Sequence, residues 1–179
     1  MSAVIIDPGE DFDSILKYVD DSNLYINAVL LTHGHFDHIA SATDCSEKFD
    51  SKIYMNSGDL GLTRHANLYR FLFEGKKNIK SIHFVNELID GSTLEYEGLT
   101  INVIHSPGHT SGSISLAIED NLFVGDLIAN NKIGRYDLPG GDSSQLEKSL
   151  SRIKNIKNIK WLYQGHGDVL NFDQLLQII

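Results

Sequence analysis

A cluster of metal-capable side chains directly follows a short apolar run and constrains this chain more than any other feature. The run from Ala28 to Leu31 is typical of a buried strand, and it continues as Thr-His-Gly-His-Phe-Asp-His. Three imidazoles and one carboxylate therefore lie between His33 and His38. Such ligands suit zinc and also iron or manganese. Because one metal needs only about three protein ligands, so dense a cluster indicates two metals side by side.

Three later segments repeat the same form, in which an apolar strand and a glycine precede a metal-capable side chain. They contain His109, Asp126 and His166. Taken singly, each histidine could as well be packed or exposed, and a Gly-Asp pair is common in turns. Their assignment as ligands therefore depends on the cluster, which needs partners. The other histidines lack this form; they are His65, His83 and His105.

The ligand residues, in this order, resemble those of the metallo-β-lactamase-fold hydrolases, and most closely the single-domain branch of the glyoxalase II-like enzymes (hydroxyacylglutathione hydrolases). The neighbouring motifs strengthen the resemblance, which runs from about Ile5 to about Val169. These motifs are Ile6-Asp7-Pro8-Gly9, Ser106-Pro107-Gly108-His109-Thr110, Phe123-Val124-Gly125-Asp126 and the segment from Gly134 to Asp142. The resemblance implies an α/β protein with the αββα metallo-β-lactamase sandwich, as one domain spanning residues 1–179.

The resemblance also implies how the ligands are shared between two divalent transition metals, expected to be zinc, with iron or manganese as alternatives. One metal would be held by His33, His35 and His109, the other by Asp37, His38 and His166, with Asp126 bridging them. A hydroxide between the metals would attack a carbonyl carbon, and Asp37 could orient it as a catalytic residue. Asp7 could accept a hydrogen bond from a ligand imidazole.

The expected substrate is a small-molecule thioester such as S-lactoylglutathione. A thiolate leaves without a proton, because the pKa of a thiol is about 8.5. No general acid is evident outside the ligand set. In glyoxalase II a basic residue near Arg135 contacts glutathione, so Arg135 and, more weakly, Lys132 are the candidate substrate-binding residues. The equal alternative for Arg135 is a salt bridge with Asp137 or Asp142.

Other functions of the same fold are alternatives to this one. A persulfide dioxygenase with a single iron shares the ligand motifs and is the main alternative, followed by a non-catalytic metal-binding module. Zinc β-lactamases commonly place a cysteine where this chain has Asp126, and Cys45, the one cysteine, is far from that position. Flavodiiron proteins usually carry an acid in place of His35, and nucleases of this fold need an inserted domain.

The ends of the chain differ from those of the family. Family members usually carry one or two strands before the Ile6-Asp7-Pro8-Gly9 motif, so the first sheet is expected to lack its outer strands and to present an exposed edge. The chain ends at Ile179, whereas two-domain glyoxalase II enzymes add a helical domain that helps to hold glutathione. The resemblance therefore implies tolerance for other thiols.

Composition and charge favour a cytoplasmic globular protein. The chain of 179 residues has a formal net charge of −9, which argues against nucleic acid or an anionic membrane as a partner. The sequence shows no charged-then-apolar leader pattern and no apolar run of membrane-spanning length, so a cytosolic protein is the expectation. The sequence does not indicate an oligomeric state.

Hydrophobic periodicity and turn residues predict the order of the elements. Strands are expected at Ala3 to Asp7, Ala28 to Thr32, Lys52 to Met55 and Lys160 to Tyr163, hairpins at Thr93 to Ile104 and Ser113 to Val124, and helices at Phe12 to Val19, His38 to Phe49, Asp142 to Ile153 and Asp173 to Ile179. The aromatic-rich stretch from Gly61 to Gly75 has no clear pattern. Its rings could line a substrate entrance, although core packing is the preferred interpretation.

Overall fold

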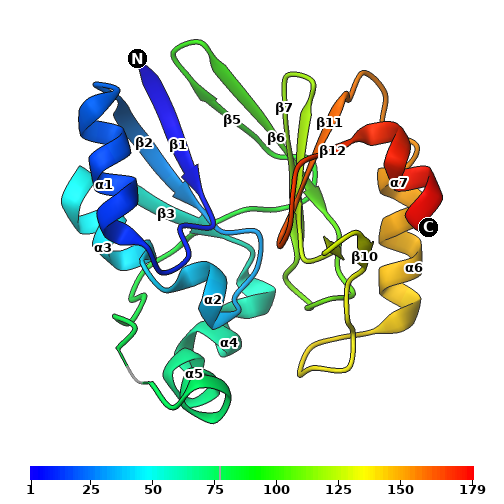
Figure 1. Cartoon of the computed structure of the whole chain (residues 1–179), viewed down its shortest axis with the longest axis horizontal. Coiled ribbons are helices and arrows are strands. Elements are labelled where there is room, and N and C mark those ends of the chain that lie inside the picture. The colour runs from blue at the N-terminus through cyan, green and yellow to red at the C-terminus, as the bar shows by residue number, and fades with distance from the viewer. Residues whose placement is uncertain (77) are drawn as a thin grey trace. The chain divides into compact units, whose positions relative to one another are not determined.

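The computed structural model describes residues 1–76 and 78–179 and divides into two compact units. The first unit comprises Met1–Glu87 with Tyr96–Leu99, and the second comprises Leu88–Glu95 with Thr100–Ile179. Each unit is built on one main β-sheet with helices packed against it (Figure 1). Each has its own cluster of buried apolar side chains.

The first unit contains a parallel sheet in the order β1-β2-β3-β4. Its strands are β1 (Ser2–Ile6), β2 (Tyr25–Leu30), β3 (Lys52–Met55) and β4 (Asn86–Glu87). Parallel neighbours need long crossovers, which contain α1 (Phe12–Asp21) between β1 and β2 and α3 (Ala42–Phe49) between β2 and β3. Ala28, Val29 and Leu30 are completely buried because β2 lies inside the sheet. Strand β1 lies at the edge of this sheet, where the sequence predicts an exposed edge.

The helix predicted from His38 to Phe49 is interrupted, which corrects the sequence interpretation. The structure has α2 (Phe36–Ile39) and α3, separated at Ala40 and Ser41. Gly9, at φ +57°, lies beside this break. Its N–H donates to the His38 carbonyl at 3.1 Å, and its carbonyl accepts from the Ser41 N–H at 2.7 Å. The loop after β1 thus takes hydrogen bonds that a continuous helix would make internally.

The aromatic-rich stretch forms two short helices, α4 (Leu60–Arg64) and α5 (Ala66–Glu74), after the 3₁₀ turn η1 (Ser57–Asp59). Phe71 and Phe73 are about half exposed, at 48% and 60%. Phe73 stacks on Phe36 with ring centroids 6.1 Å apart. The preferred interpretation of these two rings as core residues is therefore wrong.

The second unit contains a six-stranded mixed sheet in the order β12-β11-β8-β7-β6-β5. Its strands are β5 (Thr93–Tyr96), β6 (Leu99–His105), β7 (Ile114–Ile118), β8 (Asn121–Gly125), β11 (Trp161–Gln164) and β12 (Leu170–Asn171). Strand β7 is antiparallel to both β6 and β8, and its pairing with β8 forms the hairpin predicted from Ser113 to Val124. Strand β11 runs parallel to β8, so the carboxyl ends of these two strands meet at one edge.

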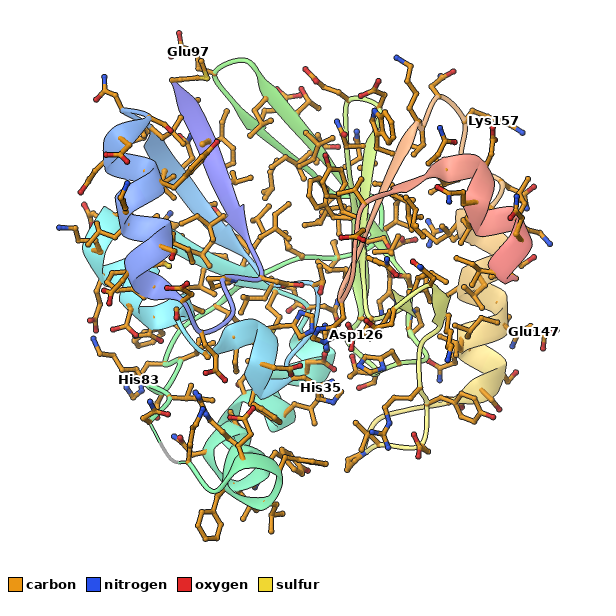
Figure 2. The ribbon with its side chains drawn as sticks, viewed as in Figure 1. His35, His83, Glu97, Asp126, Glu147 and Lys157 are labelled. Carbon is orange, nitrogen blue, oxygen red and sulfur yellow. The ribbon has the colours of Figure 1, made fainter. Side chains whose placement is uncertain are left out.

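Two helices and a small hairpin complete the second unit. Helix α6 (Ser143–Ile153) buries Leu146, Leu150 and Ile153 against the sheet, as predicted. Glu147 projects from its outer face (Figure 2). Helix α7 (Phe172–Ile178) closes the chain, and β9 (Ile128–Ala129) pairs with β10 (Lys132–Ile133) in a separate hairpin. Among the described residues, no helix has the length and apolar character needed to cross a bilayer.

Gly108 generates the first testable prediction, because it leaves no room for a side chain. Its φ is +134°, and an added Cβ would lie 2.2 Å from the Leu146 backbone nitrogen in α6. We expect Gly108→Ala to lower the free energy of unfolding by more than about 3 kcal/mol, measured by urea denaturation. Gly98→Ala is the control, since Gly98 has φ +74° with open space around it and should lose only about 1 kcal/mol. Equal losses would contradict the packing argument.

Candidate metal centre

The loop that follows β2 carries the dense cluster predicted from the sequence. His33 and His38 are buried, with 1% and 4% exposure, whereas His35 and Asp37 are half-buried. Figure 2 shows the His35 side chain at the start of α2. The His33 ring meets that of His35 edge-on, with centroids 4.8 Å apart, and lies 4.1 Å from that of His38. An imidazole binds a metal in its neutral form.

Asp7 organises the base of this loop. It directly follows β1 with φ +45°, a conformation that few non-glycine residues adopt. Its carboxylate accepts hydrogen bonds from the Thr32 N–H at 2.7 Å and from the Thr32 hydroxyl at 2.5 Å. It also contacts His38 Nδ1 at 3.0 Å. Because a carboxylate only accepts, Nδ1 of His38 carries the proton and Nε2 keeps the lone pair that a metal requires.

Thr32 extends the same control to His33, which the sequence analysis did not anticipate. The Thr32 hydroxyl lies 3.1 Å from His33 Nδ1 and uses its own hydrogen on Asp7. It can therefore only accept from Nδ1–H, which leaves Nε2 of His33 as the lone-pair donor. Atoms of Asp7, His33 and His38 are close enough together to suggest a metal group. The hydrogen bonds instead give Asp7 an orienting role. The sequence signal for this contact is the Thr32-His33 dipeptide after β2, together with the acid Asp7 after the neighbouring strand β1.

Asp126 brings two predicted ligands together in the second unit. Its Oδ2 lies 3.5 Å from His109 Nε2, and its Oδ1 lies 3.7 Å from His166 Nε2. Two ligands about 2.1 Å from one tetrahedral ion are separated by about 3.4 Å. Each carboxylate oxygen thus faces a different imidazole at a spacing that fits shared metal ligands. This arrangement suits a bridging carboxylate better than a turn residue.

Glycines make the close approach around Asp126 possible. A Cβ on Gly165 would lie 1.9 Å from Asp126 Oδ1, and a Cβ on Gly134 would lie 1.7 Å from the Asp126 carbonyl oxygen. The Gly165 N–H donates to the Gly125 carbonyl at 2.8 Å. His166 therefore reaches Asp126 because β8 and β11 end side by side and no side chain intervenes.

His109 lies in the loop between β6 and β7 and is 1% exposed. Its Nδ1–H donates to the Arg135 carbonyl at 2.7 Å, since a carbonyl only accepts. Nε2 is left facing Asp126. Buried hydroxyls fix the loop backbone: the side chain of Thr110 lies 2.7 Å from that of Ser113. In each of the three buried histidines, these contacts place the proton on Nδ1 and the lone pair on Nε2.

The remaining histidines and the cysteine lie outside these groups. His65 Nδ1 contacts the Gly61 carbonyl at 2.8 Å, His105 Nε2 contacts the Ser111 carbonyl at 3.0 Å, and His83 is exposed. Cys45 is completely buried, and burial raises its thiol pKa to about 11, with a further contribution from Asp44. It therefore lacks the thiolate character of a metal ligand.

The guanidinium of Arg135 is bound to Asp137. Its Nε lies 2.8 Å from Asp137 Oδ1, and its Nη2 lies 3.0 Å from Oδ2. The hydrogen bonds raise the pKa of Arg135 and lower that of Asp137. Both side chains are exposed, at 55% and 66%, so solvent screens the pair. Lys132 lies in β10 and is exposed. A substrate-binding role for either cation stays a prediction.

The donor atoms fit the metals expected. Neutral imidazole nitrogens and carboxylate oxygens suit zinc, iron and manganese. Comparison with known proteins identifies the family. Residues 1–166 match the model of the metallo-beta-lactamase superfamily. The chain belongs to that superfamily. The α/β class and the metallo-β-lactamase fold predicted from the sequence are confirmed.

Among its relatives, a probable metallo-hydrolase of Methanocaldococcus jannaschii is 33% identical over 93% of this chain and 83% of its own length. The hydroxyacylglutathione hydrolase GloC of Haemophilus influenzae is 29% identical over 97% of this chain and 84% of its own. These names agree with a metal-dependent hydrolase. The second agrees with the glyoxalase II resemblance.

Two solved structures are also similar to this chain. The protein TTHA1623 in a di-iron-bound form has a TM-score of 0.87 and 31% identity, covering 97% of this chain and 86% of that one. The BLEG-1 B3 metallo-beta-lactamase has a TM-score of 0.89 and 30% identity, covering 98% and 86%. Both similarities agree with the metallo-β-lactamase fold.

The Asp7–Thr32 hydrogen bonds generate the second prediction. Thr32→Val removes the acceptor for His33 Nδ1–H while keeping the side-chain volume. We expect metal affinity to fall by about tenfold, within the 10- to 100-fold range for such outer contacts. Competition with a chromophoric chelator measures it. Thr43→Val, which removes a hydroxyl 3.3 Å from the Ser81 carbonyl, is the control. Wild-type affinity in Thr32→Val would exclude the orienting role.

Proposed function

We propose that this protein is a two-metal hydrolase that cleaves small-molecule thioesters. His33, His35 and His109 hold one metal, and Asp37, His38 and His166 hold the other, with Asp126 bridging the two. The observation that carries the proposal is the carboxylate of Asp126, whose two oxygens face the Nε2 atoms of two different histidines at 3.5 and 3.7 Å. A residue that served one metal, or only a turn, would not need this double approach.

The chemistry depends on the metals and on how the chain presents them. When bound, two divalent cations lower the pKa of water towards neutrality and stabilise negative charge on a carbonyl oxygen. Asp37 is half-buried, and its Oδ2 lies 3.9 Å from His38 Nε2. From there it would accept a hydrogen bond from a water held at the metals. Asp7 and the Arg135 carbonyl keep the ligand histidines in the required tautomers.

The leaving group favours a thioester. A thiolate departs without protonation, because the pKa of a thiol is about 8.5. An amide nitrogen, by contrast, requires a general acid to leave. Arg135 and Lys132 have exposed side chains, and either cation would bind a remote carboxylate of the substrate. The similarity to a hydroxyacylglutathione hydrolase supports this substrate class. We propose zinc as the metal, with iron or manganese as alternatives.

The third prediction concerns metal stoichiometry. Protein purified without added metal and then loaded should contain about two transition-metal ions per chain, measured by plasma emission spectrometry. Asp126→Ala should lose both ions and hydrolytic activity, because the bridge serves both sites. His65→Ala, which removes a histidine bound to the Gly61 carbonyl, should keep both. Loss of one ion with most activity retained would show that Asp126 does not bridge.

The fourth prediction concerns the substrate. Metal-loaded protein should hydrolyse S-lactoylglutathione and other thioesters. The reaction is measured by the amount of thiol released. If Arg135 binds a remote carboxylate, Arg135→Ala should raise KM about tenfold with little change in kcat, because that contact is similar in the ground and transition states. Lys157→Ala, which removes an exposed cation from the segment between α6 and β11, serves as the charge control.

The same assay includes a cephalosporin and glutathione persulfide, the latter with oxygen uptake recorded. Turnover of the persulfide by folded, single-iron protein, with no thioester cleavage, would replace the proposal by a dioxygenase. Turnover of the cephalosporin alone would replace it by a β-lactamase. Binding of metal without any turnover would favour a metal-binding module.

A further inference from the structure

A buried carboxylate that the proposed chemistry does not use lies against the histidine loop. Asp59 is completely buried. Its Oδ2 accepts a hydrogen bond from the Gly34 N–H at 2.9 Å, across 25 residues of sequence. Burying a charged group is costly unless hydrogen bonds compensate, so a buried Asp59 indicates a specific requirement at this place. Gly34 is the residue between His33 and His35.

The position of Asp59 in its own helix makes the contact more informative. Asp59 is the N-cap residue of α4, a place where an aspartate normally accepts from the helix's own free N–H groups. Here the side chain makes no capping hydrogen bond. In α1, by contrast, Asp11 caps in the usual way and accepts from the Ser14 N–H at 3.1 Å. The carboxylate of Asp59 is thus directed to the histidine loop instead of to α4.

Gly34 and Asp59 are in close packing contact. A Cβ on Gly34 would lie 2.9 Å from the Asp59 carbonyl oxygen and 3.0 Å from its Cβ, so a side chain there would push the two apart. The turn that carries Asp59 is itself fixed. The Asn56 side chain accepts from the Gly58 N–H at 3.0 Å, and the Ser57 hydroxyl donates to Glu87 at 2.5 Å.

We infer that Asp59 is a positioning residue for metal binding: its carboxylate, through the Gly34 N–H, fixes the peptide between His33 and His35 so that both imidazoles bind the same ion. This inference rests on the proposed function, which assigns both histidines to one metal. A hydrogen bond to a carboxylate is stronger than one to a neutral acceptor, and it acts at the backbone between the two ligands. The Asp7 and Thr32 contacts set the His33 tautomer, whereas Asp59 sets the direction of the chain that follows.

The test uses the 179-residue chain and three variants, Asp59→Ala, Asp59→Asn and Asp11→Ala. Cobalt(II) is the probe, because its visible absorption reports ligand geometry. Affinity is measured by competition with a chelator, and thermal unfolding of the metal-free protein reports stability. We expect Asp59→Ala to weaken cobalt binding by about 10- to 100-fold and to change its absorption spectrum. Asp59→Asn keeps an acceptor without the charge and should lose about threefold to tenfold.

Asp11→Ala removes an ordinary helix cap and should lower thermal stability while keeping the wild-type affinity and spectrum. Asp59→Ala with wild-type affinity and spectrum, and only a loss of stability, would overturn the inference. If Asp59→Ala does not fold, Asp59→Asn decides: weaker binding supports the positioning role, and unchanged binding overturns it. Failure of the wild-type protein to bind cobalt would instead overturn the proposed function, so the two failures are distinguishable.

Discussion

The hydrogen bonds of the Asp7 carboxylate are the constraint on which the first unit's polar loop depends. A parallel strand such as β2 delivers its next residues into a buried position, where Thr32, His33 and His38 have almost no access to water. Each of their polar groups needs a partner there. Asp7 meets this need from the end of the neighbouring strand, contacting Thr32 twice and His38 once. The strained φ of +45° at Asp7 is tolerated because these contacts fix the residue.

The second unit solves the same problem with backbone rather than with a carboxylate. Its candidate ligands are positioned by the Arg135 carbonyl, which fixes His109, and by glycines that let neighbouring segments approach Asp126. Gly134 and Gly165 are needed for space, not for unusual dihedrals, since an added Cβ would overlap Asp126 at either position. The glycines of the resemblance motifs thus have a physical function that is separate from any direct role in chemistry.

The salt bridge with Asp137, one of the two alternatives that the sequence left open for Arg135, is formed in the structure and would compete with the proposed substrate contact. The Arg135 guanidinium makes a bidentate contact with Asp137, and both groups face solvent. A substrate carboxylate would have to compete with Asp137 for the same fork of donors or bind beside it. Because solvent screens an exposed pair, the cost of exchange is small. The pair therefore orients the arginine without removing it from use.

The sequence by itself determined the donor chemistry, the α/β class and most strands and helices. The candidate donor types follow from the cluster between His33 and His38, and the strand of Ala28 to Leu31 follows from its apolar run. Helix α6 follows from the spacing of its apolar residues. All of these are local patterns. Only the tertiary structure decided the break before α3, the two helices of the aromatic-rich stretch, the Thr32 contact with His33 and the link between Asp59 and Gly34. The break before α3 and the link between Asp59 and Gly34 depend on atoms brought together across tens of residues. The Thr32 hydroxyl accepts from its neighbour His33 because Asp7, distant in sequence, takes the hydrogen of that hydroxyl. Gly9 meets Ser41, and Asp59 meets Gly34. Local periodicity carries no information on such contacts, because they arise when strands and loops distant in sequence pack side by side.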